Sequence, residues 1–225
     1  MNSYYNKNNS RIKSIIEALF YNRYFYIAYN ILFLVLAKIT NSYYKVFFTA
    51  YFLIFTSYFI HIWSHKIPIV KNLHLLHHTK KINKYISAEI LELFLNLLFI
   101  GGGILIPLNL YFKSDFSPFN EYAILLYTLI YTFQHMVVYH LLKVPSHTTH
   151  HTVDKTCLDD TCKTTEKVYN YGPDAIDVLF GTKKHLQEYE NMGPLIPFII
   201  ILIILVIFNY NNKFDVIKWL QSKIY

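Results

Sequence analysis

Long apolar blocks separated by short polar segments dominate the chain. Four blocks have the roughly 17 to 25 residues that a helix needs to cross a bilayer; they are residues 24–40, 46–63, 87–111 and 120–142. A fifth block, 195–208, has 14 residues and contains Pro197, so it is compatible with a thin span, a re-entrant segment or an interfacial helix. The pattern predicts an all-α integral membrane protein with about four transmembrane helices in two hairpins and a C-terminal apolar segment.

Composition agrees with this prediction. Hydrophobic residues make up 54% of the 225 residues and charged residues 16%, against about 25% charged residues in ordinary soluble domains. A disordered chain is excluded, and two cysteines cannot form the disulfide framework of a small secreted fold. Lys and Arg number 21 against 14 Asp and Glu. These cations lie between apolar blocks rather than along one face, so we expect no nucleic-acid partner.

Ahead of the first block, Ile12, Ile15, Ile16, Leu19 and Phe20 recur at helical spacing. That periodicity favours equally a helix in the membrane interface and a helix packed on the rest of the protein. We therefore divide the chain into an N-terminal polar and interfacial segment, 1–23, a membrane domain, 24–185, and a hydrophobic tail, 186–225.

The basic residues predict the orientation of the spans. Segments 1–23, 64–86 and 143–193 carry four, five and six Lys or Arg residues, whereas 41–45 and 112–119 carry one each. Cytoplasmic loops are enriched in these residues. We therefore expect the N-terminus, and the segments that follow the second and fourth spans, to face the cytosol.

Ten of the eleven histidines fall between positions 61 and 151, at the predicted cytosolic ends of two spans. They form four groups: His61 with His65; His74 with His77 and His78; His135 with His140; and His147 with His150 and His151. Residues three or four apart share one face of a helix, so each triplet, if helical, directs its imidazoles one way. His135 and His140 lie about 140° apart on a regular helix. Both can therefore bind one metal site only if the helix bends; otherwise one of them contacts a ligand rather than the metal.

Such a set predicts a metal site, because ionisable groups at a membrane mark function. No cysteine stands at a ligand spacing from the triplets, which argues against a structural zinc site. Imidazole suits iron, zinc, copper and nickel, so the ligand type leaves the metal open. Eight to ten imidazoles exceed what one ion can take, which favours two metals. Beside hydrocarbon, such a centre could oxidise a C–H bond of a lipid.

The order of the motifs resembles the fatty acid hydroxylase / sterol desaturase superfamily of membrane di-iron oxygenases. HIWSHKIPIVKNLHLLHH (61–78) matches its first two histidine motifs, HTTHH (147–151) the third, and NYGPDAIDVLFGT (170–182) its tail segment. The resemblance covers about 60–185. Ile176 stands where the family usually has Trp, and Val178 where a basic residue is common. Gly172 and Gly181 are expected to serve turns.

The resemblance implies a histidine-rich helical cap on the cytosolic side that holds two iron ions, with zinc as a substitute in purified protein. It implies ligation by His61, His65, His74, His77, His78, His147, His150 and His151, with His140 as a ninth ligand and His135 as a tenth. Asp154 and Asp177 are candidates to accept the second N–H of a ligating imidazole, or else are solvated loop charges.

The expected function is dioxygen-dependent hydroxylation or desaturation of a lipid substrate, a sterol or a fatty acyl or sphingolipid chain. Electrons would come from a separate cytochrome-type donor and its reductase. The family implies the endoplasmic reticulum or another internal membrane. The alternative is a histidine-rich membrane metal-binding or metal-transport protein without oxygenase activity, although a transporter is expected to place polar residues through its spans rather than at one face. A haem-binding electron carrier fits adjacent histidines such as His77 and His78 poorly.

Overall fold

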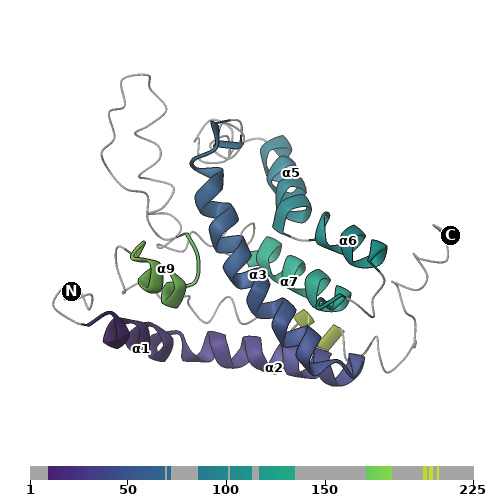
Figure 1. Ribbon diagram of the computed structural model, residues 1–225, viewed down its shortest axis with the longest axis horizontal. Helices are drawn as coiled ribbons and strands as arrows, with labels where there is room; N and C mark the ends of the chain where they lie inside the picture. Colours follow the sequence, from purple (N-terminus) through teal and green to yellow (C-terminus); the bar gives the residue numbers. More distant parts are fainter. Residues whose placement is uncertain are drawn as a thin grey trace.

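A computed structural model describes residues 10–68, 70–71, 86–100, 102–112, 117–134 and 171–183, with isolated positions between 200 and 207. The regular elements of these residues are all helices, and no strand occurs among them (Figure 1). This confirms the all-α prediction for the part of the chain described.

Helices α2 (Arg23–Thr40) and α3 (Tyr43–Ser64) form a hairpin. Asn41 ends α2 in the left-handed conformation, with φ 48°, which Asn tolerates better than most residues. Both helices are long and apolar enough to cross a membrane, by length and composition. At about 1.5 Å per residue, α3 is roughly 33 Å long, against about 30 Å of hydrocarbon. The predictions of helices at 24–40 and 46–63 are confirmed.

The third predicted span, 87–111, is not one continuous helix. It consists of α5 (Ile86–Leu95), the π-helix η2 (Asn96–Ile100) and α6 (Leu105–Tyr111). The break lies at Gly102, whose φ is +97° and where an added Cβ would lie 2.2 Å from Cγ2 of Ile124 in the next helix. Only glycine combines that backbone conformation with so close a neighbour.

Helix α7 (Glu121–Phe133) begins where the fourth span was predicted to begin. Asn120 caps it by accepting a hydrogen bond from the N–H of Ala123 at 2.9 Å. Ser57 of α3 and Tyr127 of α7 share a buried hydrogen bond of 2.6 Å, and side chains from α2, α3 and α7 form the main core cluster. The rest of the predicted span, to residue 142, lies outside the described residues.

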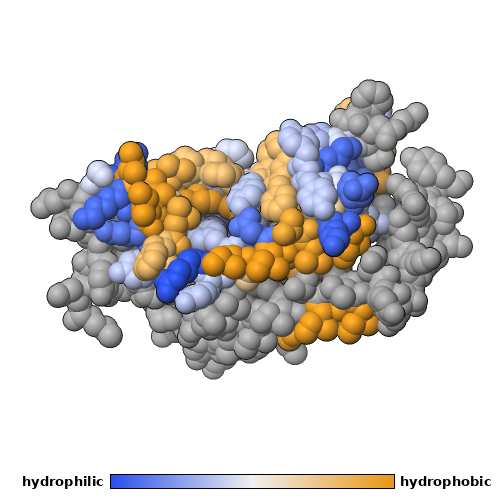
Figure 2. Space-filling model, turned by 90° about the horizontal axis from the view of Figure 1, so that it is seen from below, coloured by the Kyte–Doolittle hydropathy of each residue, from blue (hydrophilic) through white to orange (hydrophobic). Residues whose placement is uncertain are grey.

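Helix α1 (Arg11–Tyr21) lies beside the short helix α9 (Asp174–Phe180). It buries Ser14 and Ala18, while Ile12, Ile16 and Phe20 are 60 to 71% exposed. Figure 2 shows exposed apolar side chains among hydrophilic ones on the face that includes α1 and α2. Packing on the protein is therefore confirmed for α1, through its small residues. Its apolar side is left facing outward, as an interfacial helix requires.

The C-terminal apolar block lies mostly outside the described residues. Of those described, Ile201 packs against the main core cluster, and the others are exposed; these are Ile200, Ile203, Ile204 and Ile207.

Candidate metal centre

The last turn of α3 brings two predicted ligands together. His61 and His65 are four residues apart, so their side chains lie on one face of the helix. Their ring centroids are 5.3 Å apart, and the two residues are 5% and 9% exposed. The first histidine motif is therefore a buried pair of imidazoles where α3 ends.

A hydrogen bond fixes the tautomer of His61. Its Nδ1 lies 2.7 Å from the carbonyl oxygen of Tyr171. A carbonyl can only accept, so Nδ1 carries the proton and the neutral ring keeps its lone pair on Nε2. The Nε2 atom is buried. Ligating histidines commonly donate their second N–H to a carbonyl or carboxylate in this way, which orients the ring.

The Tyr171 carbonyl is held in place by Asp177. Its carboxylate accepts hydrogen bonds from the backbone N–H groups of Tyr171 (3.0 Å) and Gly172 (3.1 Å). It also accepts one from the hydroxyl of Thr182 at 2.6 Å. Asp177 has no exposed surface, which rules out a solvated loop charge. Asp177 therefore acts on His61 through the loop, whose Tyr171 carbonyl accepts a hydrogen bond from His61 Nδ1.

Burial raises the pKa of Asp177 from 3.8 to about 7. The Thr182 hydroxyl, the Lys183 ammonium and the Gly172 N–H all act in the opposite direction, while Asp174 raises the pKa further. Removal of a carboxylate from water disfavours its ionised form. Its protonation therefore changes in the neutral range.

Tyr58 of α3 also contacts the tail segment. Its ring stacks on Phe180 with centroids 5.2 Å apart, and its hydroxyl lies 2.7 Å from that of Thr182. Gly172 packs so closely that an added Cβ would lie 3.0 Å from Cδ2 of Tyr58. The glycine at 172 is thus required by close approach rather than by a left-handed turn. Gly181, with φ +73°, ends α9 in the left-handed conformation as predicted.

The other predicted site residues lie outside the described residues; they are His74, His77, His78, His135, His140, His147, His150, His151 and Asp154. Within the described ranges, no group of three or more His, Cys, Asp or Glu side chains is placed to hold a metal ion. The structure therefore unites His61 and His65 with the tail segment. The remaining ligands stay predictions.

What is present fits a metal of the kind predicted. Two buried imidazoles face one region, and one of them is fixed in the tautomer that binds metal through Nε2. Neutral imidazole suits iron and also zinc, copper and nickel. The donor set is thus compatible with iron without selecting it.

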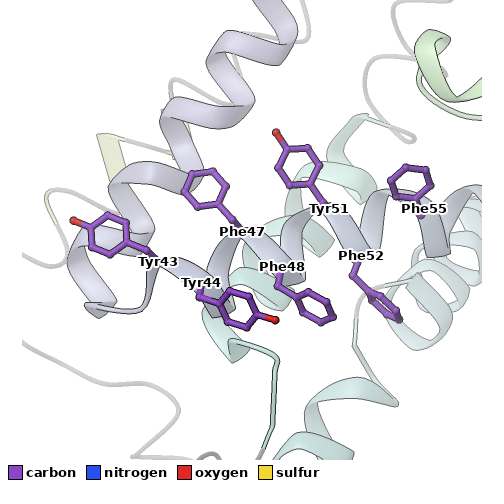
Figure 3. Close-up of a pocket in the computed structure, with 7 residues that line it drawn as sticks. All are labelled: Tyr43, Tyr44, Phe47, Phe48, Tyr51, Phe52 and Phe55. Carbon is purple, nitrogen blue, oxygen red and sulfur yellow. The ribbon is translucent and has the colours of Figure 1, made fainter. Parts of the chain in front are cut away.

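An aromatic groove of about 550 Å³ lies on the N-terminal part of α3, away from the histidines. Figure 3 shows its lining as two rows of rings, one of Tyr43, Phe47, Tyr51 and Phe55, the other of Tyr44, Phe48 and Phe52. Neighbours in each row are four residues apart, so each row follows one ridge of the helix. Phe55 is six residues from His61, about 9 Å along the axis, so the groove is separate from the candidate metal centre.

Comparison of the chain with protein-family models, curated proteins and solved structures finds no match. The fold and the geometry around His61 therefore carry the functional argument.

Proposed function

We propose that this chain is an integral membrane, non-haem di-iron oxidoreductase that uses dioxygen to hydroxylate or desaturate a lipid. One observation carries the proposal: the 2.7 Å bond between His61 Nδ1 and the Tyr171 carbonyl. It joins the first histidine motif to a tail segment 110 positions away. Ligating imidazoles commonly donate their second N–H to a carbonyl in this way, so the contact supports the proposal.

The position of the histidines supports a lipid substrate. α2 and α3 form a hairpin with its turn at residues 41–42. The start of α2 and the end of α3 then lie at the same membrane face, and the basic segments before and after the hairpin favour the cytosol for that face. Imidazoles at the end of a spanning helix lie beside hydrocarbon, where an acyl chain or sterol is within reach.

The predicted ligands would hold two iron ions, which when bound supply the reduction of dioxygen with electrons from a separate cytochrome-type donor. The described residues orient the centre. His61 and His65 offer ring nitrogens, the Tyr171 carbonyl keeps the proton of His61 on Nδ1, and Asp177 fixes that carbonyl. Tyr58 and Phe180 stack on each other beside this loop.

The first test is the metal content of detergent-purified protein from iron-supplemented cells. We expect about two iron ions per chain and a large loss in His61→Ala. His185→Ala is the matched control, because the resemblance gives it no ligand role, and it should retain the metal. Absence of bound metal in the unmodified chain would overturn the proposal.

Lipid analysis of cells that express the chain with a competent electron donor distinguishes an oxygenase from a metal-binding or transport protein. An oxygenase adds a hydroxylated or unsaturated product that disappears in His61→Ala. Bound metal with an unchanged lipid profile would favour the metal-binding or transport alternative.

A further inference from the structure

A buried polar cluster lies at the start of α9. Asp174, the first residue of α9, accepts a hydrogen bond from Asn22 Nδ2 on Oδ2 at 2.9 Å. Its other oxygen, Oδ1, pairs with the ammonium of Lys183. The three residues are 5 to 6% exposed. Both carboxylate oxygens of Asp174 are thus engaged by partners that flank α1 and α9.

Such a cluster does more to fix geometry than to add stability. Desolvation of a buried ion pair offsets much of its attraction, whereas loss of one partner leaves an uncompensated charge. Asn22 stands between α1 and α2 and is 152 positions from Asp174. The cluster therefore ties the start of the first spanning helix to α9.

Helix α9 has seven residues, too few to be stable alone, so its position depends on its neighbours. Asn22 and Lys183 hold its first residue, and Val178 is buried with Ala18 of α1. On the other side, Phe180 and Thr182 contact Tyr58 of α3. α9 bridges α1 and α3, and Asp177 in its middle holds the Tyr171 carbonyl.

We propose that Asn22, Asp174 and Lys183 are positioning residues of the metal centre, which lock α9 so that the Tyr171 carbonyl stays on Nδ1 of His61. The α1–α2 junction, far from the histidine motifs in sequence, is thus part of the scaffold of the site. This inference rests on the proposed function for its consequence in metal binding, but not for its effect on the imidazole.

The test compares Asn22→Ala and Lys183→Met with Asn30→Ala and Lys66→Met in the full chain. Asn30 also bonds through its side chain, to Tyr26 and Tyr51 on the hairpin, and Lys66 is exposed. ¹⁵N NMR of histidine-labelled, metal-free protein reports the tautomer of His61. We expect the Nδ1–H form in the unmodified chain and both controls, and a mixture of tautomers in the two cluster variants.

Titration with Co²⁺ gives the second readout. Cluster variants should bind Co²⁺ about tenfold more weakly and show an altered ligand-field spectrum. Lys183→Arg, which keeps the positive charge, should retain the Co²⁺ affinity and the spectrum of the unmodified chain. Circular dichroism identifies a variant that has merely unfolded. A His61 tautomer and Co²⁺ affinity unchanged in both cluster variants would overturn the inference. A normal tautomer response without Co²⁺ binding by any form would instead overturn the proposed function.

Discussion

The phenol oxygen of Tyr58 lies 2.7 Å from the hydroxyl oxygen of Thr182, 124 positions later in the chain. Thr182 donates its own proton to the Asp177 carboxylate, so Tyr58 is the donor of the first bond. Tyr58→Phe keeps the stacked ring and removes one hydrogen bond. We expect a loss of about 1 kcal/mol in the free energy of unfolding, measured by denaturation in detergent. Tyr44→Phe, at a 74% exposed residue, should show no loss, and equal values for the two variants would contradict this assignment.

The two glycines of the tail segment should respond differently to alanine. Gly172→Ala places a methyl group 3.0 Å from Tyr58, and overpacking of this kind costs about 1–3 kcal/mol. Gly181→Ala meets nothing within 4 Å, but its φ of +73° costs an L-residue about 1–2 kcal/mol. Both variants should lower the melting temperature. Only Gly172→Ala should weaken metal binding, because only it displaces the loop that carries the Tyr171 carbonyl. Equal metal affinities would disprove the distinction.

Asp177 should make stability depend on pH. Its folded pKa of about 7 exceeds the ordinary value of 3.8, so the folded state binds the proton more tightly than the unfolded state does. The contribution of Asp177 to the free energy of unfolding is fully present below about pH 4. It is lost as the pH rises to about 7, at up to roughly 1.4 kcal/mol per pH unit. Denaturation curves at several pH values, with Asp177→Asn as comparison, measure it. A slope that persists in the asparagine variant would assign the effect to other groups.

The α2–α3 hairpin predicts that its turn and the end of α3 lie on opposite sides of the membrane. Single cysteines placed by Ser42→Cys and Lys66→Cys, in a background with Cys157 and Cys162 replaced by serine, should react with a membrane-impermeant maleimide from opposite faces of sealed vesicles. The reason is the roughly 33 Å length of α3. Labelling of both positions from the same face would show that α3 does not span the membrane.

The first two candidate spans could be predicted to within three residues because continuous apolar runs of that length have few structural alternatives. The break at Gly102 is signalled by three consecutive glycines, 101–103, yet composition alone reads 87–111 as one apolar block. What decides the break is the close approach of Ile124. That contact belongs to packing between helices, which periodicity does not contain.

The candidate site likewise divides into features that the sequence pattern predicts and features that only packing decides. The spacing of His61 and His65 predicts a shared face, and they share one. Asp177 could be identified as a carboxylate near the ligands, but its role depends on bonds to backbone N–H groups that no motif specifies. Val178, which stands where the superfamily that the sequence resembles commonly has a basic residue, is buried with Ala18. An apolar side chain suits that position because α1 covers it, and Asn22 and Lys183 gave no signal in sequence.

The long separation between His61 and Tyr171 orders the events of biosynthesis. A ribosome adds about 5–20 residues per second, so roughly 6 to 24 s pass between the synthesis of residue 61 and that of residue 182. For most of that interval the α2–α3 hairpin has already been synthesised, while the Tyr171 carbonyl that accepts the hydrogen bond from His61 does not yet exist. Metal loading that needs both motifs can therefore only follow translation of the tail, on a chain whose first helices are already in place.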